Sequence, residues 1–120
     1  MGKPQNPRVY KEVIDELVRA CKSGQGQLSA QRARKGVWNQ NATPDFIPEQ
    51  HQINLLLKRL SPEEREVLAG MLADEVVTGV FETLKVLEQF SIEPFTGSYE
   101  GSPFEDFIGR LADWNWPDAE

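Results

Sequence analysis

Apolar residues recur at helical spacing in four stretches of the 120-residue chain, and each stretch follows a proline. These prolines are Pro7, Pro48, Pro62 and Pro103. Proline is favoured at the first position of a helix because the N–H that it lacks has no helical partner there. No stretch shows the sustained alternation of apolar and polar residues that marks a half-buried strand. The pattern therefore predicts an all-α fold, a compact bundle of four to five helices.

The third stretch predicts a long central helix over about 62–90, where Ser61 and Glu64 have the spacing of a capping box. Its apolar residues cover a broad side, so we expect contacts with this helix from several directions. Gly70 and Gly79 lie inside it, and we expect close helix packing or a bend at one of them. The apolar band consists of Leu68, Met71, Leu72, Val76, Val80, Thr83, Leu87 and Phe90, extended by Val77, Phe81 and Leu84.

The remaining helices are shorter. The stretch 28–40 is compatible with a short helix that ends at Gly36. The last helix, before which Ser102 and Glu105 again have capping-box spacing, leads to "DWNWPDAE". A bulky aromatic side chain near a chain end has little reason to be there unless it packs on something. We therefore expect the last helix to dock on the long one, and Trp114 or Trp116 to seal the core.

Length and charge bound the domain count and the class of function. A chain of 120 residues suits one domain over 1–120, with a flexible segment over residues 1–6. The net charge of −6 argues against binding nucleic acid by bulk charge and against general attraction to anionic lipid. No apolar run is long enough to span a membrane, and no secretory signal is recognisable. Cys21 is the only cysteine, which excludes an internal disulfide and fits a reducing cytoplasm best.

The charge is divided unevenly along the chain. Residues 1–60 carry a balance of +5, and residues 61–120 carry a balance of −11. Such halves attract each other within one fold or between the two chains of a homodimer. Within one chain, we expect Arg32, Arg34 and Lys35 to lie near acids of the long or the last helix.

Few residues indicate chemistry. Arg32 and Arg34, with Trp38 close by, have the composition of a site that binds phosphate or stacks a base, although such clusters more often form a solvated face. Glu75 lies at the edge of the apolar band, where a carboxylate can act as an acid or base or simply pair with an arginine. His51 is the only histidine, and no Cys/His spacing supports a metal site. No phosphate loop, serine elbow or paired-carboxylate motif is present, so we assign no catalytic residue, metal or cofactor.

The order of several segments resembles a family of small bacterial domains of unknown function. The resemblance rests on "YKEVIDELV", "RKGVWN", the stretch from "NLLLKRLSPEE" through "KVLEQ", and "FEDFIGRLADWNWPD". It implies a helical fold and no particular activity. Where members of that family carry Gly-Ile-His-Asp in the long helix, this chain has Gly79-Val80-Phe81-Glu82, without the histidine.

The interpretation that fits these observations best is a small cytoplasmic, non-catalytic protein-binding domain. Its acidic C-terminal half suits an inhibitor of a basic protein partner, as immunity and antitoxin proteins are. One alternative is a small-ligand binder or enzyme with a pocket between helices, formed by Glu75, Trp38 and the basic cluster. Another is a structural domain that self-associates through Val77, Phe81 and Leu84.

Overall fold

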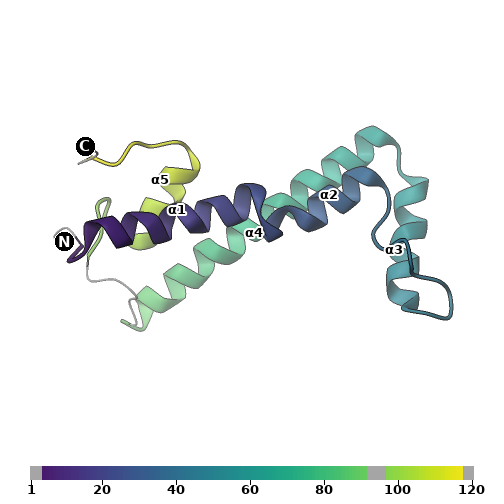
Figure 1. The fold of residues 1–120 in the computed structure, drawn as a ribbon, viewed down its shortest axis with the longest axis horizontal. Helices are drawn as coiled ribbons and strands as arrows, with labels where there is room; N and C mark the ends of the chain where they lie inside the picture. The colour runs from purple at the N-terminus through teal and green to yellow at the C-terminus, as the bar shows by residue number, and fades with distance from the viewer. Residues whose placement is uncertain (1–3, 92–96, 118–120) are drawn as a thin grey trace. The chain divides into compact units, whose positions relative to one another are not determined.

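The computed structural model describes residues 4–91 and 97–117, which form α-helices and one short 3-10 helix but no strand (Figure 1). This confirms the all-α fold with four to five helices. It also confirms the long helix expected over about 62–90. In chain order the elements are α1 (Pro7–Ser23), the 3-10 helix η1 (Gln25–Gln27), α2 (Leu28–Lys35), α3 (Pro48–Arg59), α4 (Pro62–Gln89) and α5 (Pro103–Leu111).

The chain divides into two compact units. One unit, Ser23–Val76, contains η1, α2, α3 and the first part of α4, and we call it the α2–α3 unit. The other, Met1–Lys22 with Val77–Glu120, contains α1, the last part of α4 and α5, and we call it the α1–α5 unit. The assignment of one domain to 1–120 stays a prediction. Of the segment 1–6 that was expected to be flexible, residues 1–3 lie outside the described part of the chain.

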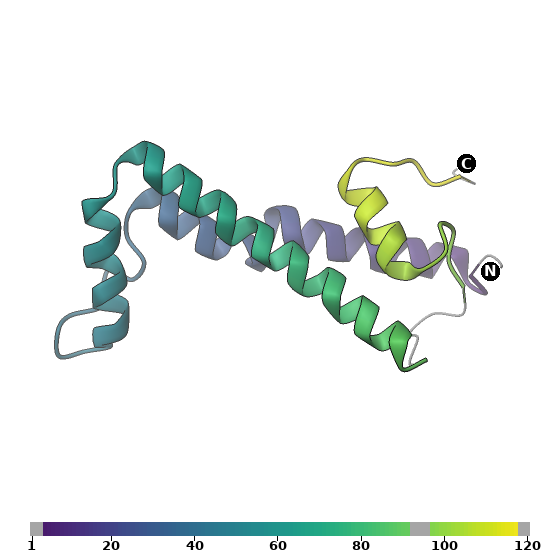
Figure 2. The same ribbon diagram turned by 180° about the vertical axis from the view of Figure 1, so that it is seen from behind.

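Small side chains form the core of the α2–α3 unit. Ala30 and Ala33 on α2 and Ala69 on α4 are fully buried around Leu57 of α3. Because the distance between packed helices depends on the side chains at the contact, these alanines let α2 and α4 approach closely. Figures 1 and 2 show the two helices side by side. The partly buried residues around this core are Trp38, Ile53, Leu60, Leu68, Leu72 and Ala73.

The core of the α1–α5 unit encloses a carboxylate. Asp106 is fully buried and accepts hydrogen bonds from the Tyr10 hydroxyl at 2.5 Å and from the backbone N–H groups of Tyr99 at 2.9 Å and Glu100 at 2.8 Å. A buried carboxylate is tolerated only when donors satisfy its oxygens, so Asp106 ties residues 99–100 and α5 to α1. The buried apolar side chains of this unit are Tyr10, Ile14, Val18, Cys21, Leu84, Phe107 and Trp116.

The C-terminal tail closes this core. Trp116 is 8% exposed, meets the Tyr10 ring edge-on at 6.0 Å, and donates its indole N–H to Asp15 at 3.2 Å. Arg110 of α5 donates to the same carboxylate at 2.8 Å and lies over the Trp116 ring at 5.4 Å. Trp116 therefore packs as expected for the tail, while Trp114 stays half-buried beside it.

The last helix contacts the long one through aromatic rings. Phe104 of α5 meets Phe81 of α4 edge-on at 5.2 Å, which agrees with the expected docking of these helices. The hydroxyl of Ser102 donates to Glu88 of α4 at 2.8 Å. The Ser102 side chain makes no capping hydrogen bond at the start of α5, so the capping box expected there is wrong. The box at Ser61 is present, because Ser61 N–H donates to Glu64 at 2.8 Å and Glu64 N–H donates to Ser61 Oγ at 3.1 Å.

Parts of the expected apolar band on α4 are exposed. Met71 is 60% exposed and Phe90 is 72% exposed, so neither belongs to a core. A Cβ added at Gly70 or Gly79 would meet open space, so neither glycine marks a close helix contact, and the alternative, a bend at one of them, stays a prediction. The broad band reflects residues on both the inner and the outer side of the helix, which periodicity alone does not separate.

Candidate functional site

A tight turn at the end of α2 leads into a loop over residues 37–47. Gly36 ends the helix with φ of +84°, the left-handed conformation that glycine adopts without strain. A Cβ at this position would lie 2.8 Å from a guanidinium nitrogen of Arg65 on α4. The left-handed backbone therefore favours glycine at this position, and a larger residue would also displace the end of the flexible Arg65 side chain. The short helix ending at Gly36, left open by the sequence, is present.

The first residues of the loop are held by one amide side chain of α3. Asn54 Oδ1 accepts hydrogen bonds from the backbone N–H of Trp38 at 2.6 Å and of Asn39 at 3.1 Å. Asn54 Nδ2 donates to the carbonyl of Asn39 at 2.7 Å, and the Asn39 side chain donates to Gln50 at 2.7 Å. These bonds fix the backbone that carries Trp38.

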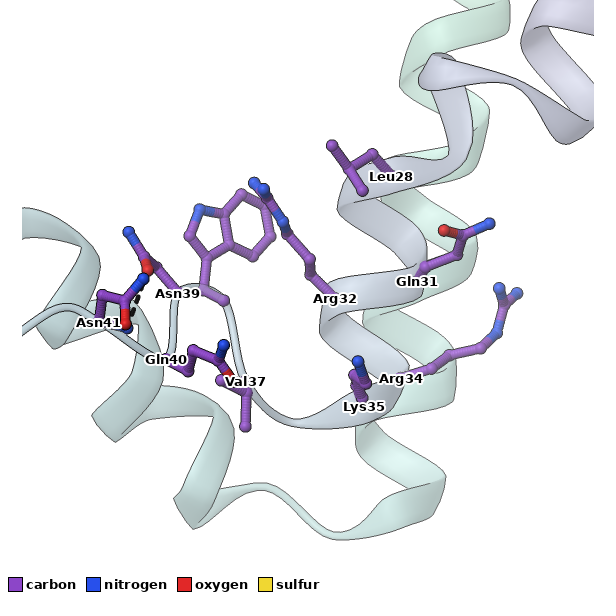
Figure 3. A pocket seen from close by; sticks show the side chains of 10 residues that line it. Leu28, Gln31, Arg32, Arg34, Lys35, Val37, Asn39, Gln40 and Asn41 are labelled. Atoms are coloured by element: carbon purple, nitrogen blue, oxygen red, sulfur yellow. Dashed lines mark hydrogen bonds between the residues drawn. The ribbon is translucent and has the colours of Figure 1, made fainter.

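Between α2 and this loop lies an open pocket of about 950 Å³ (Figure 3). Its lining combines three cationic side chains, four primary amides and apolar groups, without a carboxylate. The lining residues are Leu28, Gln31, Arg32, Arg34, Lys35, Val37, Trp38, Asn39, Gln40 and Asn41.

The cationic side chains of this pocket have different surroundings. The guanidinium carbon of Arg32 lies 5.6 Å from the centre of the Trp38 ring, within the range of a cation–π contact. Figure 3 shows Arg32 reaching from α2 toward the loop and Arg34 pointing away from it. Arg34 Nε pairs with Glu66 of α4 at 2.7 Å, as expected for a contact between basic and acidic residues within one chain. Among the described residues, no carboxylate forms an ion pair with Arg32 or Lys35.

The structure brings together some of the site residues that the sequence indicates. Arg32, Arg34 and Trp38 line one pocket, whereas Glu75 is exposed on α4 and is not part of the lining. Trp114 and Trp116 belong to the α1–α5 unit. The sequence analysis missed the amide-rich part of the site. The run Asn39-Gln40-Asn41, directly after a helix-ending glycine and a tryptophan, is the signal from which it could have been found.

The outward side of α4 in the α2–α3 unit forms a second candidate surface. Val67 and Met71 stand four residues apart, so they share a side of the helix, and they are 67% and 60% exposed. Three exposed carboxylates stand on or beside the same side. We call this surface the α4 outer stripe, and its residues are Glu63, Val67, Met71, Asp74 and Glu75.

The apolar residues proposed for self-association lie elsewhere. Leu84 is buried, Val77 is half-buried, and Phe81 packs against Phe104. They therefore offer little free apolar surface for a second copy.

The perturbed titratable groups favour no nucleophile. Burial, reinforced by the hydrogen bond to Asp106, raises the pKa of Tyr10 far above its ordinary value. Burial also raises the pKa of the Cys21 thiol, which keeps it protonated at neutral pH. Within residues 4–91 and 97–117, no group of three or more His, Cys, Asp or Glu side chains is placed to hold a metal ion. None of the helices in these ranges has the length and apolar character needed to cross a bilayer.

Comparison with protein families gives a match over nearly the whole chain. The model of a family described only as a family of unknown function, DUF6547, matches residues 3–118. This confirms the resemblance to domains of unknown function. Comparison with curated proteins and with solved structures gives no match.

Proposed function

The chain belongs to this family of unknown function, and we propose that it is a non-catalytic protein-binding domain whose partner is basic. Family membership implies no activity, so the proposal depends on the chain's own surface. The observation that carries it is the α4 outer stripe.

The stripe combines exposed apolar side chains with carboxylates. Val67 and Met71 are among the most exposed large apolar residues of the described chain, although a helix normally turns such residues inward. Adjacent exposed apolar groups bordered by polar ones are typical of interaction surfaces, and methionine is enriched in them. Val67 and Met71 would fill the centre of the contact, and the carboxylates would surround it.

The charge of the stripe indicates the chemistry of the partner. Glu63, Asp74 and Glu75 are exposed, and no ion pair joins them to other described residues. Acidic side chains at the rim of an interface accelerate association with a basic protein and make it sensitive to salt. The overall charge of −6 has the same sign. The proposal includes inhibition of that partner, in the manner of immunity or antitoxin proteins. It also includes a cytoplasmic location.

The α2 pocket supports binding over catalysis. Its lining contains no carboxylate, histidine or cysteine, and Glu75, the acid that the alternative interpretation placed there, lies outside it. General acid–base catalysis needs a titratable group within hydrogen-bond reach of the reacting atoms, and of such groups the lining offers only Lys35. The enzyme alternative therefore loses the residue on which it depended.

The experiment compares partner capture by variants of the stripe with capture by matched controls. The full chain is immobilised, partners are captured from the native host at low and high salt, and the captured protein is purified and titrated by calorimetry. Val67→Ser should weaken binding by about tenfold, which is the loss of a small hot spot. Val86→Ser makes the same change at a residue of α4 that is 47% exposed and lies outside the stripe, and it should bind normally.

The charge arm uses the double variant Glu63→Gln with Asp74→Gln. It should slow association and reduce the salt dependence, because rim charges act mainly on the association rate. Asp45→Asn, an exposed acid of the loop, is the control. Equal binding by Val67→Ser and Val86→Ser would contradict the proposal. A dimeric mass in solution that Val67→Ser abolishes would make the partner a second copy of this chain.

A further inference from the structure

The α2 pocket is positively charged in an acidic protein. Three of its lining side chains are cationic and none is a carboxylate, while the chain as a whole carries −6. Glu66 neutralises Arg34, but Arg32 and Lys35 form no ion pair with a described residue. Since Arg32 and Lys35 stand three residues apart on α2, they share a side of the helix. Two positive charges on one side of the helix, without a paired carboxylate among the described residues, favour the binding of an anion.

Arg32 is oriented as well as charged. Its guanidinium carbon lies 5.6 Å from the centre of the Trp38 ring, a cation–π contact that leaves the N–H groups able to bind an anion. Those N–H groups form a planar fork that matches the oxygens of a carboxylate or a phosphate. The ring contact thus places the anion-binding group beside Trp38 in the pocket.

The aromatic wall of the pocket is fixed before a ligand arrives. Trp38 packs against the core of the α2–α3 unit while it also lines the pocket, and Asn54 holds its backbone N–H at 2.6 Å. A ligand that stacks there pays little to order the ring, which favours affinity. The side chains of Gln31, Gln40 and Asn41 add amide groups, each of which both donates and accepts hydrogen bonds.

Cationic residues in the last turn of α2 also stabilise the negative end of that helix. This accounts for the charges alone. It does not account for a hollow of about 950 Å³ beside them, for a tryptophan fixed in its wall, or for the amides around it.

We propose that the α2 pocket binds a small aromatic anion, with its ring against Trp38 and its carboxylate or phosphate on Arg32 and Lys35. This site is separate from the α4 outer stripe, so its test does not depend on the proposed protein partner. Two sources supply such an anion: an aromatic carboxylate, or a nucleoside monophosphate with its phosphate attached through a sugar.

The test is a titration of the full chain with four probes: AMP, adenosine, inorganic phosphate and benzoate. Binding is followed by NMR through the Trp38 indole N–H signal, assigned with Trp38→Phe, and by calorimetry. AMP or benzoate should bind and shift this signal at concentrations up to about 1 mM, and adenosine and phosphate should bind at least about tenfold more weakly. Preference for AMP assigns a phosphate, and preference for benzoate assigns a carboxylate.

Variants separate a built site from bulk charge. Arg32→Gln and Lys35→Gln should each lower the affinity for the probe that binds by roughly ten- to a hundredfold, as expected for loss of a charged hydrogen bond. Lys58→Gln removes an equal charge from an exposed position on α3 and should change nothing. Arg32→Lys keeps the charge but loses the planar fork, so it should bind almost as weakly as Arg32→Gln. The melting temperature of each variant is measured as a check on folding.

Three results would overturn the proposal. The first is no binding of AMP or benzoate at about 1 mM. The second is binding of phosphate or adenosine as tight as that of AMP and benzoate, which would show that ring and anion are not recognised together. The third is equal weakening by Lys58→Gln and Lys35→Gln, which would reduce the site to general electrostatic attraction.

Discussion

The Tyr10 hydroxyl donates a hydrogen bond of 2.5 Å to Asp106, and the two residues lie 96 positions apart in the sequence. Tyr10 is on α1 and Asp106 is on α5, so this bond joins the beginning of the chain to its last helix. Both side chains are buried. Neither residue was singled out by the sequence, because the carboxylate has the ordinary position of an acid in the first turn of a helix.

Asp106→Asn should lower the free energy of unfolding by about 1–3 kcal/mol, the cost of leaving buried hydrogen-bonding groups unsatisfied. An asparagine can accept with only one of its two side-chain atoms. Its NH₂ group would face one of the donors that the carboxylate now satisfies. Urea unfolding measures the effect. Glu105→Gln, an exposed acid in the same helical turn, is the control and should change stability little.

The raised pKa of Tyr10 predicts a loss of stability at alkaline pH. Below the ordinary tyrosine pKa of about 10, Tyr10 is protonated in both the folded and the unfolded state. Above it, the unfolded chain releases this proton while burial keeps it on the folded protein, so the unfolded state becomes favoured as pH rises. The melting temperature should fall more steeply above about pH 10 in the wild type than in Tyr10→Phe. An equal fall of the melting temperature with pH in the two proteins would contradict this prediction.

Glycine substitutions should have opposite effects at two positions. Gly36→Ala places a side chain in the left-handed region and against Arg65, so we expect a loss of at least about 1–2 kcal/mol. Gly79→Ala adds a methyl group in open space inside α4, so we expect a gain of about 0.5–1 kcal/mol from helix propensity. Thermal and urea unfolding measure both. A stable Gly36→Ala variant would mean that the turn after α2 is not the one described.

Asn54→Ala should release the start of the loop that carries Trp38. Two backbone N–H groups and one carbonyl lose their partner, so hydrogen exchange at the Trp38 and Asn39 amides should become faster. Gln52→Ala, an exposed residue of the same helix, is the control and should leave both amides protected. Unchanged exchange in Asn54→Ala would show that the loop is held by other contacts.

The sequence predicted the helices because their signals are local. Proline at the first helical position and apolar residues at helical spacing marked where α1, α3, α4 and α5 begin, and the capping box at Ser61 is present as its spacing indicates. The Ser102 spacing failed because Glu88, a residue distant in the chain, takes the hydroxyl. A local pattern contains no information about such a partner.

The candidate sites were predicted only in part, for the same reason. Arg32 and Trp38 lie close in sequence on a helix and the turn after it, so proximity alone brings them together. Glu75, which only the alternative interpretation placed beside them, lies outside the pocket, since the broad apolar band of α4 did not reveal which edge faces α2. Met71 was counted in that apolar band, and its exposure appears only when the neighbours of α4 are known.

Trp38 packs on the core of the α2–α3 unit and also lines its pocket. Occupancy of the pocket is therefore coupled to folding by mass action. A molecule that binds only the folded form adds RT ln(1 + [L]/Kd) to its stability, about 2.7 kcal/mol at a hundredfold excess over Kd. A thermal-shift screen of a metabolite library would thus sort compounds by affinity without an assay for activity. The wild type and Trp38→Phe, run side by side, would separate ligands of this pocket from those that stabilise the protein elsewhere.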